Sequence, residues 1–218
     1  SAVVNGQMVD NDGHLRRLER SLEEIELKSP LPIGEIEKVQ TELIERNNLR
    51  EGIVYLQISR GDAERDFLWP EDISPTLVMF TQEKPLLHHP LATKGASIIT
   101  VPEIRWQRRD IKTTALIAQA MAKHAARKSG ADDAWMVEDG YVTEGTSTNA
   151  FIVTTDGTLV TRELSNKILH GITRRAVLQL AKEADLRIEE RPFTPEEAYD
   201  AAEAFATGSS FFVMAVVE

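Results

Sequence analysis

The strongest candidates for chemistry in this chain are one lysine and one carboxylate, which follow each other at a distance. Lys112 comes after two arginines, Arg108 and Arg109, and before an alanine-rich segment that we expect to form a buried helix. Desolvation and neighbouring cations both lower the pKa of a lysine, and the neutral amine can attack an aldehyde and carry protons. Glu144 lies downstream in a turn of Gly, Ser, Thr and Asn residues. A carboxylate there can keep a pyridine nitrogen protonated, and small neighbours let the backbone approach such a ring.

A third feature is the start of a helix that we expect near Thr173. Gly171 and Ile172 precede this threonine, and Arg174 and Arg175 follow it. The backbone N–H groups at a helix start have no partners within the helix, and together with the helix dipole they bind phosphate. Each of the three features is ambiguous alone, because most lysines are solvated and most acidic turns are only turns. Their order in one chain favours a single cofactor site.

These motifs resemble those of the fold-type IV pyridoxal-phosphate enzymes, and specifically the D-amino-acid-type aminotransferases. Asp110-Ile111-Lys112-Thr113 is similar to the segment that carries the family's Schiff-base lysine. The run from Thr143 to Asn149 resembles the family's TEGSSSN almost position for position, with Asn149 as its closing asparagine. Gly171-Ile172-Thr173 matches the family's GIT at the phosphate. The likeness extends over almost the whole chain.

The resemblance implies a role for each matching residue. Lys112 would form the Schiff base with pyridoxal 5′-phosphate and shuttle the α-proton, and Glu144 would anchor the ring nitrogen. Arg17 resembles the arginine of the family's H-x-x-R-L helix, which pairs with the phosphate. The remaining cofactor-binding residues that it implies are Ile172, Thr173, Ser209, Ser210 and Asn149. Gly208 stands where the family often has a hydroxyl residue.

Substrate recognition is implied by a strand motif and the residues after it. The segment from Tyr55 to Gly61 is similar to the family's Y-x-Q-x-[TS]-R-G strand, so Tyr55 could line the pocket or serve only the strand. Arg65 matches the arginine that binds the substrate carboxylate through its planar fork. Phe67 stands where the family has a histidine, so this chain lacks one of the two residues that bind the substrate carboxylate in the family.

The activity that the resemblance implies is transfer of the amino group of a D-amino acid, such as D-alanine, to a 2-oxo acid such as 2-oxoglutarate. The scheme would be ping-pong. Two alternatives on the same fold are a branched-chain L-amino-acid aminotransferase and an aminodeoxychorismate lyase. A cofactor-free binding protein is the alternative from another class. The resemblance also implies a homodimer whose pocket borrows a loop from the partner.

The composition limits the kinds of partner and site that the chain can have. The chain has 218 residues and a formal net charge of −10, which argues against nucleic acid or an anionic membrane as the main partner. It has no cysteine, so disulfides and cysteine-built metal sites are excluded. We interpret His88 and His89 as solvated loop residues and expect no metal site. No apolar run approaches the length of a membrane span, and the expected location is the cytoplasm.

The pattern of turns and apolar residues predicts an α+β fold with two domains rather than a doubly wound sheet. We expect a small N-terminal α/β domain over residues 1–84, a proline-containing linker at 85–90, and a larger cofactor-binding domain over 91–218, with the cofactor at the domain interface. Family members carry a longer segment between the opening hairpin and the helix near His14, and they continue past Glu218. We expect these pieces to be mobile rather than lost.

Local signals predict the individual elements. Asn5-Gly6, Asp139-Gly140 and Asp156-Gly157 mark three hairpins. Strands are expected over residues 53–59, 76–81, 96–101 and 211–217. The expected helices are one from about His14, one that carries Ile36, Val39 and Leu43, one over Thr113–Lys128, one near Thr173, and one after Thr194, which has the spacing of a capping box to Glu197.

Overall fold

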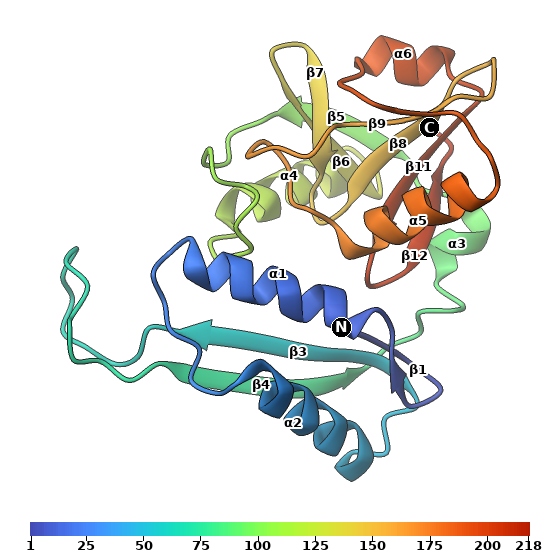
Figure 1. Ribbon diagram of the computed structural model, residues 1–218. Coiled ribbons are helices and arrows are strands. Elements are labelled where there is room, and N and C mark those ends of the chain that lie inside the picture. Colours follow the sequence, from blue (N-terminus) through green and yellow to red (C-terminus); the bar gives the residue numbers. More distant parts are fainter. The chain divides into compact units, whose positions relative to one another are not determined.

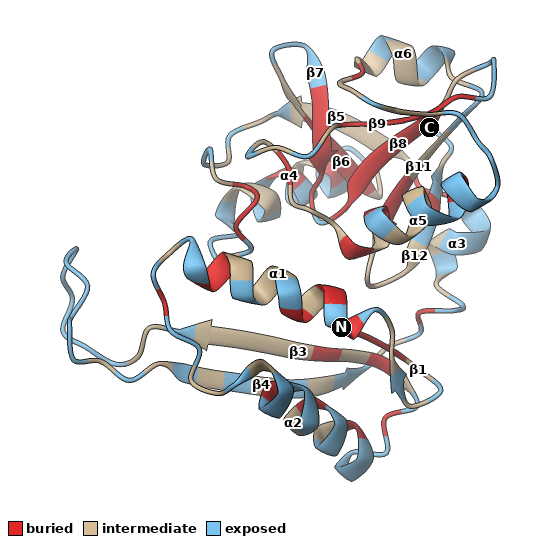
Figure 2. Ribbon diagram, viewed as in Figure 1, coloured by how far each residue is buried: buried red, intermediate tan, exposed pale blue.

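The computed structural model describes all 218 residues, and the chain divides into two compact units (Figure 1). The first unit is Ser1–Leu86 and the second is Leu87–Glu218. Each unit has its own sheet structure and its own buried hydrophobic residues (Figure 2). No helix combines the length and the apolar character that crossing a membrane requires.

The first unit contains a four-stranded antiparallel sheet in the order β2-β1-β3-β4. Its strands are β1 (Ala2–Val4), β2 (Gln7–Met8), β3 (Glu51–Ser59) and β4 (Thr76–Glu83). The expected hairpin between β1 and β2 is confirmed, because Asn5 and Gly6 both have positive φ angles, 53° and 78°. The two helices of this unit are α1 (Asn11–Glu23) and α2 (Ile33–Arg46).

Both helices of the first unit differ in detail from the sequence prediction. α1 begins at Asn11 rather than near His14, because the buried Asn11 side chain donates to Gln40 Oε1 of α2 at 3.0 Å. α2 buries Ile36, as expected, but its other buried residues are Gln40 and Ile44. Each of these two lies one residue after the predicted core positions, Val39 and Leu43. The reason is packing, since Ile44 joins a core cluster that β1 and β3 supply.

The second unit contains two sheets. A five-stranded sheet has the order β10-β9-β8-β11-β12, and a three-stranded sheet has the order β5-β6-β7. The β5–β6 and β9–β10 pairs are parallel, and the other pairs are antiparallel. The strands are β5 (Ile98–Pro102), β6 (Asp133–Glu138), β7 (Tyr141–Gly145), β8 (Asn149–Val153), β9 (Leu159–Thr161), β10 (Ile188–Glu190), β11 (Glu203–Gly208) and β12 (Phe212–Val216).

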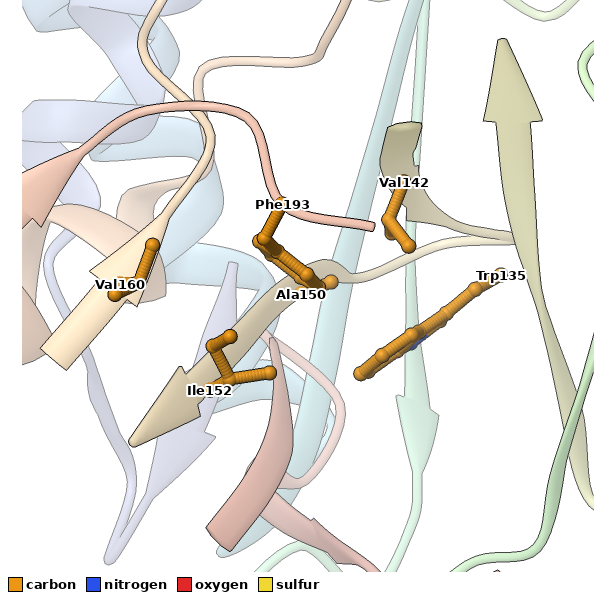
Figure 3. Packing of buried hydrophobic residues seen from close by; sticks show 6 residues of the cluster. All are labelled: Trp135, Val142, Ala150, Ile152, Val160 and Phe193. Carbon is orange, nitrogen blue, oxygen red and sulfur yellow. The ribbon is translucent and has the colours of Figure 1, made fainter. Parts of the chain in front are cut away.

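The main core of the second unit joins its two sheets (Figure 3). Trp135 of β6 and Val142 of β7 pack with Ala150 and Ile152 of β8, and Phe193 meets the Trp135 ring edge-on with the centroids 5.9 Å apart. This contact between sheets holds the end of β7 close to the start of β8. The residues that link these strands, Thr146 to Thr148, are therefore fixed at both sides.

Four helices complete the second unit: α3 (Pro90–Lys94), α4 (Ile117–Lys128), α5 (Ile172–Glu183) and α6 (Pro195–Asp200). The capping box predicted for the last of these is confirmed at Thr194 and Glu197. α4 begins at Ile117 and not at Thr113, because the Thr113 hydroxyl accepts a hydrogen bond from Ala115 N at 3.3 Å and so favours a local turn over the helix. β11 was not expected at all, yet it lies between β8 and β12.

Candidate functional site

Glu144 lies at the end of β7, and its carboxylate accepts hydrogen bonds from three directions. Arg105 Nη1 lies 2.5 Å from Oε1, and Asn149 Nδ2 donates to Oε2 at 2.9 Å. The backbone N–H of Leu169 donates to both oxygens at 3.1 Å. Asn149 begins β8, the strand that follows the small-residue turn, so the Thr143–Asn149 motif folds back on itself around its own acid. The contact between Glu144 and the asparagine that closes the motif is a finding of the structure.

The Glu144 side chain is buried. The residue is only 3% exposed, and this burial raises the pKa of its carboxyl group. The Arg105 guanidinium and the Leu169 N–H act in the opposite direction, because they stabilise the carboxylate. A carboxylate held by several donors in a buried position keeps a fixed orientation. It can therefore present a negative charge to a basic ring nitrogen.

Arg105 is itself held in place by Glu103. The two side chains form a buried ion pair in which Nε and Nη2 of Arg105 lie 2.9 and 2.5 Å from the two oxygens of Glu103. The Thr143 hydroxyl also donates to Glu103 Oε2, at 2.8 Å. Burial acts to raise the pKa of Glu103, but the bonds from Arg105 and Thr143 outweigh it and hold that pKa below its usual range. Sequence reasoning missed Glu103 and Arg105, although an acid and an arginine two residues apart, just upstream of Lys112, were a usable signal.

Lys112 follows a buried and well-anchored segment. Arg109 N donates to Asn166 O at 3.0 Å, and Arg109 Nη2 lies 2.6 Å from Glu138 Oε1. Asp110 is fully buried in a two-point ion pair with Arg108, and Ile111 is buried beside it. The lysine itself is exposed, and the expectation that the helix after it is buried is wrong. The reason is that α4 starts later and buries only Ala122 and Ala126.

The start of α5 carries the expected Ile172 and Thr173. Gly171 is the N-cap residue and provides no side-chain cap, and the first turn of the helix contains no acidic residue. A Cβ atom at Gly171 would collide with Asn149 Oδ1, so the helix start lies directly against the asparagine that holds Glu144. The unmet N–H donors of this turn therefore lie close to the carboxylate site.

The turn after β11 reaches the same region. A Cβ atom at Gly208 would come within 3.5 Å of Ser147 O, so this turn packs against the small-residue motif. Ser209 and Ser210 follow directly and are half-buried. The structure thus brings Glu144, Asn149, the start of α5 and this serine turn together, as the sequence suggested.

The other expected site residues belong to the first unit. Arg17 lies on α1 with its Nη2 atom 3.3 Å from His14 Nδ1. Tyr55 on β3 stacks on Phe80 with the ring centroids 4.7 Å apart, and its hydroxyl donates to Gln57.

The proposed substrate residues Arg65 and Phe67 lie on the long exposed connection between β3 and β4 (Figure 2). Phe67 is 90% exposed, and the Arg65 guanidinium lies 5.6 Å from the centroid of its ring. An aromatic ring, not a second hydrogen-bond donor, therefore accompanies this arginine.

A buried carboxylate at a strand end, a lysine after an anchored segment and an uncapped helix start, on this α+β architecture, define an enzyme of the fold-type IV class. The chain belongs to the class IV aminotransferases, because the family model described as amino-transferase class IV matches residues 2–218. A D-alanine aminotransferase from Bacillus licheniformis is 35% identical over 216 residues, which are 98% of this chain and 75% of that protein. The expected family and fold class are confirmed, and the chain is an aminotransferase.

Two solved structures support the fold. A branched-chain aminotransferase from Thermoproteus uzoniensis matches with a TM-score of 0.85 at 26% identity, over 100% of this chain and 75% of that one. A putative 4-amino-4-deoxychorismate lyase from Legionella pneumophila matches with a TM-score of 0.89, over 99% of this chain and 79% of that one. Its identity is 22%, so it shows the fold alone.

Proposed function

We propose that this aminotransferase uses pyridoxal 5′-phosphate to move the amino group of a D-amino acid, such as D-alanine, to a 2-oxo acid such as 2-oxoglutarate. The observation that carries the proposal is the buried Glu144 carboxylate, held by Arg105, Asn149 and the Leu169 N–H. The choice of a D-amino acid rests on the D-alanine aminotransferase relative, which is 35% identical.

The residues present fit this cofactor in three respects. The end of the Glu144 side chain offers the charge that a pyridinium nitrogen needs. Glycines at 145 and 171 leave room beside Thr148 and Asn149, where a Cβ atom would collide. The Thr148 hydroxyl is buried and has no hydrogen-bond partner in the protein, as expected for a group that meets a ligand.

Each residue has a defined task in this proposal. When bound, pyridoxal phosphate supplies an aldehyde and a ring that accepts electrons. Lys112 would hold the cofactor through its amine and carry a proton to and from the substrate Cα, and Glu144 would keep the ring nitrogen protonated. The residues proposed to hold the phosphate are Arg17, Ile172, Thr173, Ser209 and Ser210, while Asn149 holds Glu144.

Substrate binding is assigned to the β3–β4 connection. Arg65 is proposed to bind the substrate carboxylate, since a guanidinium can form two parallel hydrogen bonds to it. Phe67 cannot add the hydrogen bond that a histidine would, so we propose a carboxylate site with fewer donors than the family's usual one. Tyr55 is proposed as a pocket residue.

A branched-chain L-amino-acid aminotransferase is the second candidate, because a structural relative at 26% identity carries that activity in its name. Assaying D-alanine, L-leucine and aminodeoxychorismate side by side, each with its own product detection, separates the candidates. We expect turnover of D-alanine with 2-oxoglutarate and parallel double-reciprocal lines. No turnover of D-alanine, with turnover of L-leucine, would reverse the choice.

The cofactor assignment has its own test. Adding pyridoxal phosphate to the cofactor-depleted protein should produce the absorption band of the lysine-bound cofactor, and Lys112→Ala should abolish it. Lys123→Ala, an exposed lysine on α4, is the matched control and should keep the band. A band that survives Lys112→Ala contradicts the assignment.

Three broader predictions complete the proposal. We propose that residues 91–218 form the cofactor-binding domain, that residues 85–90 act as the linker, and that the active form is a homodimer. A cytoplasmic location stays a prediction of the sequence.

A further inference from the structure

Thr207 carries a buried hydroxyl group that nothing in the protein satisfies. The residue is 2% exposed on β11, and its Oγ1 atom has no hydrogen-bond partner. A buried hydroxyl without a partner is costly, and native proteins satisfy most such groups with a protein group, a water or a ligand. The position of Thr207 in the sheet shows what it faces.

The pairing of β11 with β8 places Thr207 directly opposite Asn149. Residues directly opposite each other in an antiparallel pair point to the same face of the sheet. On that face, Asn149 Nδ2 donates to Leu169 O at 3.0 Å, and its Oδ1 atom lies against Gly171, the N-cap of α5. The Thr207 hydroxyl therefore points toward the start of α5.

The hydrophobic packing of α5 confirms which face this is. Phe205, two residues before Thr207, must point to the same face as Thr207. Its ring stacks on Phe151 with the centroids 4.8 Å apart, and both rings belong to the cluster that packs against Ala181 and Val177 of α5. The face that carries Thr207 is thus the face that α5 covers.

The start of α5 lacks acceptors of its own. Its N-cap residue, Gly171, gives no side-chain cap, and its first turn has no acidic residue. The first-turn N–H donors and the Thr207 hydroxyl converge on one region from two elements, and all of them can donate to an anion. A tetrahedral phosphate group has enough acceptor oxygens to meet both.

We propose that Thr207 is a further phosphate-binding residue, whose hydroxyl donates to a phosphate group at the start of α5. The assignment rests on the proposed function in one respect, since the phosphate is that of pyridoxal phosphate in the working enzyme. Free inorganic phosphate offers the same chemistry, so both compounds are used as probes.

The experiment compares Thr207→Val with a matched control, Thr158→Val. Thr158 is also a buried threonine, at 3% exposure. It precedes Leu159, which pairs with Val153, the last residue of β8. Asn149 is the first residue of β8, so Thr158 lies at the other end of this strand, away from the start of α5. Valine keeps the shape of threonine and removes only the hydroxyl group. Thr207→Ser, which keeps a hydroxyl, serves as the rescue variant.

Affinities of the cofactor-depleted proteins for pyridoxal phosphate, pyridoxal and inorganic phosphate are measured by titration. Because a hydrogen bond to a charged group is lost, we expect Thr207→Val to bind pyridoxal phosphate at least about ten-fold more weakly. Inorganic phosphate should lose affinity similarly, while binding of pyridoxal, which has no phosphate, should not change. Thr207→Ser and Thr158→Val should match the wild type. The melting temperature of depleted Thr207→Val should not fall, since the lost hydroxyl had no partner.

Equal affinity of Thr207→Val and wild type for both phosphate compounds would overturn the proposal, and so would an equal loss for pyridoxal. The proposed function can fail separately. If wild type forms no lysine-bound cofactor but binds inorganic phosphate through Thr207, the function is wrong and the phosphate site stands. If Thr207→Val does not fold, Thr207→Ser and the wild type are compared instead. Both should bind inorganic phosphate, and the assignment is contradicted if neither protein binds it.

Discussion

Glu144 shows how one side chain depends on several distant partners. Its carboxylate meets Arg105 from upstream, Asn149 from the next strand and Leu169 from the segment before α5. None of these contacts was predicted from the motif, although Asn149 itself belongs to it. The role of Glu144 as the ring-nitrogen anchor can be tested because glutamine keeps its shape and removes its charge.

The first prediction concerns Glu144→Gln. A neutral amide cannot stabilise a protonated ring nitrogen, so kcat for D-alanine should fall on the order of a hundred-fold, as for the loss of one preorganised electrostatic contact. Steady-state kinetics with saturating cofactor measure this. Glu203→Gln, an exposed acid at the start of β11, is the control and should retain its rate. A kcat within two-fold of wild type would show that Glu144 does not act on the ring.

The second prediction concerns pH. Hydrogen bonds from Arg109 and then Lys167 lower the pKa of Glu138 to about 2. Because the folded-state pKa lies below the unfolded one, Glu138 stabilises the fold above its ordinary pKa of 4.5, and this stabilisation is lost as the pH falls toward 2. Urea unfolding should find Glu138→Gln less stable than wild type at pH 6, and the difference should shrink on acidification. A difference that grows toward pH 2 contradicts this.

Two elements of the second unit decide the site geometry. α5 brings an uncapped helix start onto Asn149, and β11 brings Thr207 and the serine turn beside the same residue. The start of α5 was predictable, because its Gly-Ile-Thr sequence was recognised as a motif. β11 was not, since Glu203–Gly208 has only one large apolar residue, Phe205, and its pairing with β8 depends on residues far away in the chain.

The third prediction concerns the contact between α5 and β8. In Gly171→Ala the new Cβ atom would collide with Asn149 Oδ1, so Asn149 must move away from Glu144. Overpacking of this kind should lower the free energy of unfolding by about 1–3 kcal/mol. Affinity for pyridoxal phosphate should fall together with the stability. Both are measured by urea unfolding and by titration.

The control for Gly171→Ala is a glycine with space around it. Gly34 lies in α2 and would have nothing within 4 Å of an added Cβ atom. Gly34→Ala should leave the stability unchanged or raise it slightly, because alanine favours the helix. A Gly171→Ala protein as stable as Gly34→Ala, with unchanged cofactor affinity, would mean that Asn149 tolerates the displacement.

At the scale of the whole molecule, the chain consists of two compact units, and the expected site residues are divided between them. Glu144, Asn149 and the phosphate residues of α5 and the serine turn belong to the second unit, whereas Arg17, Tyr55, Arg65 and Phe67 belong to the first. The chemistry proposed for Lys112 and Glu144 can thus be tested separately from the substrate profile, which we assign to Tyr55, Arg65 and Phe67.

The fourth prediction concerns assembly. If the active form is a homodimer, sedimentation equilibrium of the cofactor-loaded protein should give twice the chain mass of 24.4 kDa. The specific activity should fall on dilution once the chains separate. A monomer with undiminished specific activity at every concentration would contradict the proposal. If the dimer forms equally well with and without the cofactor, the role proposed for Lys112 is not affected.

The sequence by itself determined what depends on neighbouring residues. The Asn-Gly and Asp-Gly hairpins, the Thr194 capping box and the order of the lysine, acid and helix-start motifs are local patterns that the sequence alone shows. The tertiary structure alone decided the support of Glu144 by Arg105, the exposure of Lys112 and the position of Thr207 opposite Asn149. These depend on strand pairing and burial, which arise only when segments far apart in the chain come together.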